Sequence, residues 1–110
     1  MDFKYVRIVV GVPRAMLQTM LDAIAAAGAG VIGEYSHCSF TVAGMGRFKP
    51  SSASNPFAGE KGVVNQVDDV HIETFCAREQ AKAVTAAIRM AHPYEAPVVY
   101  LIPMLSEDDL

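Results

Sequence analysis

The sequence contains no tryptophan, only two cysteines, and no apolar run near the length of a membrane helix. Cys38 and Cys76 are too few for a disulfide framework or a paired CxxC zinc motif. A membrane helix needs about 20 apolar residues, so we expect no membrane span. The opening residues MDFKYVRIVV also lack the apolar segment and cleavage site of a signal peptide. These absences predict a cytoplasmic protein that does not associate with membranes.

Basic residues are few and are scattered singly along the chain. Nine Lys and Arg against 12 Asp and Glu give a formal net charge of −3. Proteins that bind nucleic acid gather positive charge in a patch, so we expect no nucleic-acid partner. Hydrophobic residues make up 52% of the 110 residues, which is enough to build one core. We therefore expect a single globular domain that spans residues 1–110.

Apolar periodicity predicts four strands and two helices. Gly44 and Gly46 suggest a turn followed by a short hairpin arm at 47–49, and the Ser-, Gly- and Pro-rich segment 50–63 reads as a long surface loop. The order β-α-β-hairpin-β-α-β predicts an α+β fold, the ferredoxin-like split βαβ sandwich, with both helices on one face of the sheet. The expected strands are 4–12, 34–42, 67–76 and 96–103, and the expected helices run from Pro13 to Gly28 and from Ala77 to Ala91.

The second face of such a sheet needs a cover, because no further element remains to pack on it. We expect Phe3, Tyr5, Phe75 and Tyr100 to lie on this face. A large apolar surface on a small domain usually marks an interaction site. The sequence therefore predicts that another subunit covers this face.

Three short segments are more polar than core strands require: YSHCSF, HIET and HPYE. If the predicted sheet brings them together, His37, Glu73 and His92 supply two imidazoles and a carboxylate, the ligand types of zinc and related divalent metals. A structural interpretation stays open for each residue. His37 and His71 can be hydrogen-bonded strand residues, and His92 can satisfy carbonyls at the end of a helix.

The segments GEYSHCSF, GMGRFKP, SNPFAG, VHIET and AHPYEAPVVYLIP together resemble the YqfO-type domain. This domain is inserted in many bacterial members of the dinuclear-metal family named after NGG-interacting factor three, and it also occurs alone. The segment HPYEAPVVYLIP is similar to the CutA proteins, which share the trimeric ferredoxin-like architecture of the PII signalling proteins. The resemblance covers residues 6–103 and implies a homotrimer.

The resemblance carries over only part of the family's chemistry. The family's dinuclear metal ligands belong to a larger domain that this sequence lacks, so no hydrolase activity is implied. One local departure is Ala53-Ser54-Asn55-Pro56, where the family usually has Gly-Ala-Asn-Pro. The residues that we expect to contact a small molecule in a cleft between subunits are Cys38, Tyr94, Glu95, Arg47 and Asn55.

Three functions remain open at this point. The first is an oligomeric module that binds a small ligand or a metal ion and has a regulatory role, with His37, Glu73 and His92 at the floor of the cleft. The second is a structural domain whose polar residues only hold a trimer together. The third is a small metal-dependent hydrolase with Glu73 or Glu95 as general base. We rank the enzyme last, and a divalent metal ion is the one cofactor that the residues suggest.

Overall fold

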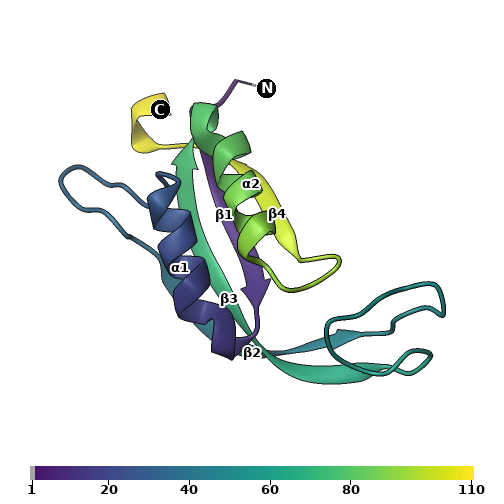
Figure 1. Ribbon diagram of the computed structural model, residues 1–110. Helices are drawn as coiled ribbons and strands as arrows, with labels where there is room; N and C mark the ends of the chain where they lie inside the picture. Colours follow the sequence, from purple (N-terminus) through teal and green to yellow (C-terminus); the bar gives the residue numbers. More distant parts are fainter. Residues whose placement is uncertain (1) are drawn as a thin grey trace.

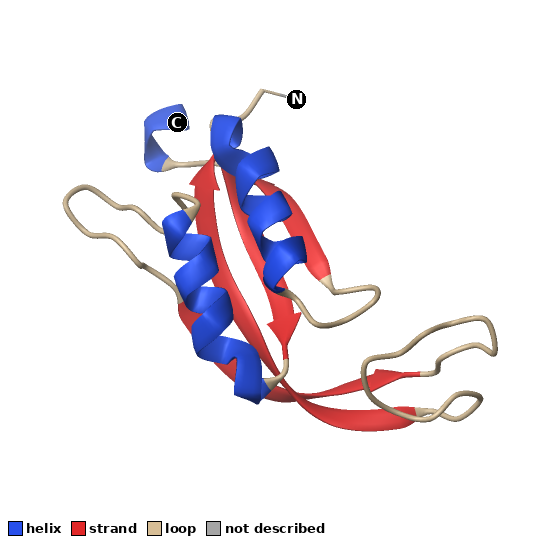
Figure 2. Cartoon of the chain, viewed as in Figure 1, coloured by secondary structure: helices blue, strands red, loops and turns tan. Residues whose placement is uncertain are grey.

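The computed structural model describes residues 2–110 and places two helices on one face of a four-stranded antiparallel sheet (Figures 1 and 2). The strand order β2-β3-β1-β4 and the two βα units confirm the predicted ferredoxin-like α+β fold. No helix in residues 2–110 is long and apolar enough to cross a lipid bilayer. The elements are β1 (Tyr5–Val12), η1 (Arg14–Met16), α1 (Leu17–Ala26), β2 (Phe40–Phe48), β3 (Asn65–Ala77), η2 (Arg78–Gln80), α2 (Ala81–Ala91), β4 (Val99–Met104) and η3 (Glu107–Asp109).

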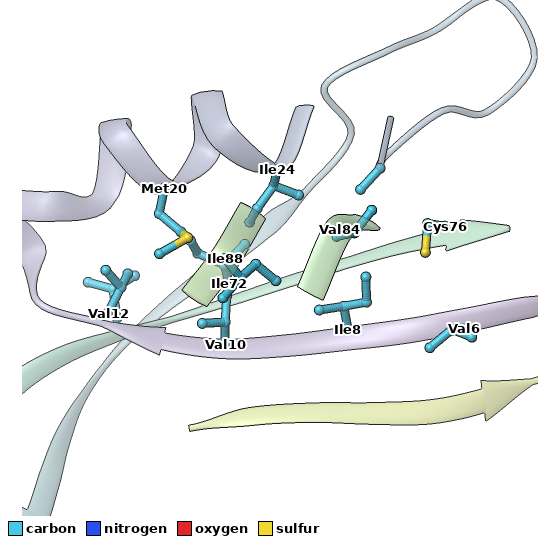
Figure 3. Close-up of a cluster of buried hydrophobic side chains, with 12 residues drawn as sticks. Val6, Ile8, Val10, Val12, Met20, Ile24, Ile72, Cys76, Val84 and Ile88 are labelled. Carbon is cyan, nitrogen blue, oxygen red and sulfur yellow. The ribbon is translucent and has the colours of Figure 1, made fainter. Parts of the chain in front are cut away.

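The hydrophobic core lies between the helices and the sheet face that they cover (Figure 3). Alternate residues of a strand point to the same face, so the odd-numbered side chains of β1 are excluded from this core. Each fully buried aliphatic side chain contributes roughly 1.5–3 kcal/mol to folding. The largest side chains with no contact to solvent are Ile8, Val10 and Val12 of β1, Met20 of α1, Ile72 of β3, and Val84 and Ile88 of α2.

Both helices begin later than the sequence predicts, because a 3-10 turn precedes each of them. Pro13 has extended backbone angles (φ −60°, ψ 143°), and η1 separates it from the first residue of α1. In the same way η2 occupies the start of the second predicted helix. Gly28 ends α1 as predicted, with a φ of 99° that suits glycine after a helix.

The second strand differs most from the prediction. Residues 34–39 are not in the sheet, and β2 begins only at Phe40. Gly44 and Gly46 lie inside β2, opposite Asp69 and Val67 of β3, rather than in a turn. Neither glycine has a positive φ, so neither reverses the chain. The short separate hairpin is therefore absent from the described chain, and β2 and β3 themselves form one long hairpin that closes through the loop 49–64.

The sheet face away from the helices is uncovered in the isolated chain; we call it the open face. The register places Tyr5, Phe75 and Tyr100 on it, as predicted. Tyr5 shares a face of β1 with Arg7 and Val9, and these two residues pair with Phe75 and Tyr100. Phe3 instead packs against the core, and its ring lies 4.1 Å below the guanidinium carbon of Arg78. The open face thus consists of strand residues alone.

The burial of Ile72 predicts how the sheet responds to a charge. Ile72 has no exposed surface, so Ile72→Asp places an unpaired carboxylate in the core and should abolish soluble folded protein. Ile72→Val removes one methylene and should cost about 0.5–1.5 kcal/mol. Circular dichroism and chemical denaturation compare the two variants. A folded Ile72→Asp protein would contradict the placement of this strand.

Candidate functional site

The HPYE segment begins with a histidine whose two ring nitrogens are both occupied. His92 is 7% exposed at the end of α2, and its Nε2 bonds the carbonyl of Gly11 at 2.5 Å. The backbone N–H of Tyr94 donates to its Nδ1 at 3.2 Å. Because Nδ1 accepts, the ring proton lies on Nε2, which donates to Gly11. His92 therefore fastens the segment after α2 to the end of β1, and neither nitrogen is free to bind a metal ion.

The next two residues of the segment hold the long loop. The carboxylate of Glu95 accepts the backbone N–H of Asn55 at 3.1 and 3.2 Å. The ring of Tyr94 lies between those of Phe57 and His92, with centroid distances of 6.1 and 4.8 Å. The structure thus brings together three of the predicted ligand-binding residues, Asn55, Tyr94 and Glu95. Their contacts join the HPYE segment to the loop 49–64.

Burial changes the chemistry of Tyr94. The loss of solvent raises the pKa of its phenol, and the negative charge of Asp69 raises it further. Its side chain therefore stays a neutral hydrogen-bond donor throughout the physiological pH range. The ring of Tyr94 thus links the loop residue Phe57 to His92.

An ion pair lies on the open face. Nε of Arg7 donates to Oε1 of Glu73 at 2.7 Å, and the two side chains are 43% and 45% exposed. The hydrogen bond from Arg7 lowers the pKa of Glu73, and the same contact raises the pKa of the guanidinium. Glu73 is therefore engaged by a cation of its own chain.

A glycine-lined cavity lies beside this ion pair on the open face, and we call it the cradle. It has a volume of about 360 Å³. Asp69 pairs with Gly44, and His71 pairs with Gly11, so both polar side chains point into the same region. The lining residues are Arg7, Val9, Val42, Ala43, Gly44, Met45, Gly46, Asp69, His71 and Glu73.

Asp69 is the polar group of the cradle with an unmet hydrogen-bonding requirement. Its Oδ1 is buried and has no hydrogen-bond partner among the described residues. Burial raises the pKa of this carboxyl, and the imidazoles of His71 and His92 oppose the rise. A carboxylate oxygen that has lost water without gaining a donor is energetically costly, which is typical of a binding site.

His37 and Cys38 lie elsewhere, in the segment between α1 and β2. Nδ1 of His37 contacts Oγ of Ser36 at 2.8 Å, and the residue has a positive φ of 60°. The backbone of Cys38 is fixed by Gly30 and by the hydroxyl of Thr74, which donates to its carbonyl at 2.9 Å. Both residues line a small cavity of about 130 Å³ against α1. His37 is therefore on the helix side of the molecule, whereas Cys38 also lines a cavity of about 470 Å³ together with Arg7 and Glu73.

One chain does not bring the three predicted metal ligands together. His37 lies against α1, Glu73 is paired with a cation on the open face, and His92 is buried beside Gly11. In residues 2–110 no three His, Cys, Asp or Glu side chains form a group that could hold a metal ion. Arg47 is exposed on β2, opposite Gln66 of β3.

Sequence reasoning did not select Arg7 or Asp69 and treated His71 as structural. A signal for them exists in the sequence. Asp69, His71 and Glu73 alternate along one strand, so all three share a face, and glycines lie opposite the first two. Polar residues that alternate on a face expected to meet a partner indicate a site rather than a core.

No protein-family model matches the chain. It is 40% identical over 103 residues to a "GTP cyclohydrolase 1 type 2 homolog" of Halalkalibacterium halodurans, a match that covers 94% of the chain and 28% of the relative. The homologue of that name in Bacillus subtilis is 40% identical over 98 residues, covering 89% of the chain and 26% of the relative. The chain thus spans about a quarter of the length of these curated relatives.

Solved structures give the same picture. A Bacillus cereus protein related to NIF3 is 34% identical with a TM-score of 0.80, covering 94% of the chain and 26% of that protein. CutA1 from the psychrotrophic bacterium Shewanella sp. SIB1 has a TM-score of 0.71 at 15% identity, covering 96% of the chain and 86% of CutA1. The second likeness is one of fold alone, and it extends over almost the whole of both chains.

The Glu95 contact predicts which group controls the long loop. Glu95→Ala removes the acceptor for the N–H of Asn55, so hydrogen exchange at this amide should become faster while the core amides keep their protection. Glu60→Ala is the matched control, since its side chain makes no hydrogen bond within residues 2–110. Exchange measured by NMR compares the variants. An unchanged Asn55 rate in Glu95→Ala would show that other contacts hold the loop.

Proposed function

We propose, starting from the confirmed resemblance of the chain to a YqfO-type domain of the CutA/PII-like superfamily, that it is a homo-oligomeric binding module with a regulatory role. Neighbouring copies cover its open face and leave a ligand cleft between them. The uncovered sheet is the observation that carries this proposal. The two helices occupy one face only, and the other face presents large apolar side chains to solvent.

The composition of the open face supports burial by another protein. Side chains that would normally avoid water surround the ion pair of Arg7 and Glu73 on this face. A large exposed apolar surface is typical of a protein interface, where Tyr, Phe and Arg are enriched. The exposed members are Tyr5 (36%), Phe40 (66%), Val42 (54%), Tyr100 (54%) and Ile102 (38%).

The long hairpin of β2 and β3 supports a second copy of this chain as the cover. Residues 70–77 of β3 pair with β1, whereas residues 65–69 pair only with residues 44–48 of β2. A two-stranded ribbon is marginally stable by itself. This ribbon extends away from the helices in Figure 1, and the radius of gyration is 15.2 Å. A compact domain of this size has a radius of about 13 Å. When copies assemble, the protruding ribbon of one copy can cover the open face of another.

Three copies is the number that the family resemblance implies. The name "GTP cyclohydrolase 1 type 2 homolog" belongs to proteins of which the chain spans about a quarter, so that activity is not assigned to it. No contact among the described residues favours the hydrolase over a binding role.

Assembly predicts a defined mass in solution. We expect the untagged protein to sediment as a trimer at micromolar concentration. Val42→Asp places a charge on the open face and should shift the protein to a monomer that stays folded, because Val42 is 54% exposed in the isolated chain. Thr19→Asp adds the same charge on the exposed surface of α1 and should leave the trimer intact. A monomeric wild type would contradict the proposal.

Metal content tests the predicted ligands His37, Glu73 and His92. Because one chain separates these residues, a site made of all three must include side chains from different copies, and the ring of His92 must exchange one of its two hydrogen bonds for the metal ion. Elemental mass spectrometry on wild type, His37→Ala and the monomeric Val42→Asp variant should then show a near-stoichiometric ion in the wild type alone. An equal low content in all three proteins would leave the histidines with structural roles and favour an organic ligand.

A further inference from the structure

We propose that the cradle around Asp69 binds a small organic cation that carries an ammonium or guanidinium group. This inference rests on the binding role proposed above, but the cradle forms within one chain and does not require the assembly. Three features of the described residues carry it: the glycines that shape the cavity, the buried carboxylate oxygen at its floor, and the charges that line it.

The glycines of the cradle are there for space rather than for backbone conformation. Gly44 and Gly46 line the cavity, Gly11 pairs with the lining residue His71, and none of these three strand residues has a positive φ. Glycine inside a strand weakens it and often marks a place where a ligand or another backbone approaches closely. A Cβ on Gly11 would lie 2.8 Å from Oδ2 of Asp69, and one on Gly46 would lie 3.6 Å from the same oxygen. Gly11 therefore leaves room for the carboxylate of Asp69 itself, while Gly44 and Gly46 keep the wall of the cavity free of side chains.

The carboxylate at the floor requires a hydrogen-bond donor. Oδ1 of Asp69 is buried without a partner in residues 2–110, although its neighbours on the sheet are fully paired in the β2–β3 ladder. A charged donor gives a shorter and stronger bond to a carboxylate than a neutral one. Because the two oxygens of a carboxylate share one charge, an ammonium or guanidinium group that bonds the carboxylate from the cavity compensates for that charge.

The lining favours a cation over an anion. Its one Lys or Arg side chain, Arg7, already donates to Glu73, so it does not neutralise Asp69. His71 points to the same side of the sheet and can add a hydrogen bond from its ring. The apolar side chains of Val9 and Val42 offer contact for a short alkyl chain. A volume of about 360 Å³ suits a small molecule, since ligand pockets begin near 300 Å³.

An NMR titration with defined probes tests the proposal. The ¹⁵N-labelled full chain is titrated with n-butylammonium chloride, and n-butanol and sodium butyrate are the neutral and anionic probes of similar size. We expect saturable shifts of the Gly11, Gly44 and Gly46 amides with the ammonium alone. Shifts that butanol or butyrate reproduces, or shifts that do not saturate, would overturn the cation site.

Two variants and one control localise the binding. Asp69→Asn keeps the shape and removes the charge, and it should weaken n-butylammonium binding about tenfold. Gly44→Ala should also weaken it, because the new methyl group enters the cradle while its nearest atom is 4.0 Å away, so the fold is retained. Asp68→Asn changes the adjacent residue on the opposite face of β3 and should bind like the wild type.

Sedimentation of the same proteins separates this inference from the assembly. Asp69→Asn should remain in the oligomeric state of the wild type, because the proposed occupant is a small molecule. If the probe does not bind and Asp69→Asn alters the sedimentation, a basic side chain of a neighbouring copy fills the cradle, which overturns the small-cation proposal. A monomeric wild type that binds the probe would contradict the assembly and leave the cradle in place.

Discussion

The central strand pair of β1 and β3 is buried on one side only, and the other elements are arranged around this asymmetry. β1 and β3 each alternate apolar core residues with residues that the helices cannot reach, and their register is fixed over eight residue pairs. A slip by one residue would move Ile8 and Ile72 out of the core together. With α1 and α2 on one side, everything that faces the other side is available for recognition. The Arg7–Glu73 pair and the cradle occupy that second face.

The HPYE segment contacts β1, one of these two central strands. His92 bonds the carbonyl of Gly11, and the side chains of Asp69 and His71 of β3 lie next to the position that a Cβ on Gly11 would take. Glu95 and the ring of Tyr94 then hold the loop between β2 and β3. The end of β1 is therefore the point where the helix end, the long loop and the open face meet.

Different parts of this arrangement were predictable to different degrees. The strand at β1 and the stripe of α1 follow from local periodicity, because Val6, Ile8 and Val10 alternate and Met20 and Ile24 recur one turn apart. The sequence places the start of β2 several residues too early. It also suggests a turn at Gly44 and Gly46, because glycines that leave open space look the same in sequence as glycines that form a turn. The grouping of Asn55 with Glu95 followed from family motifs, but its cause, a backbone N–H donated to a carboxylate, did not.

Periodicity along short stretches of chain is enough to predict the fold class, the single buried face and the residue types that chemistry could use. Which polar groups are free depends on contacts between distant parts of the chain. His92 and Glu73 have the right side chains for a metal, yet each is engaged by a partner 81 or 66 positions away. Asp69 lacks such a partner within the described chain. Whether a side chain is committed or available is set by long-range neighbours, which local patterns do not encode.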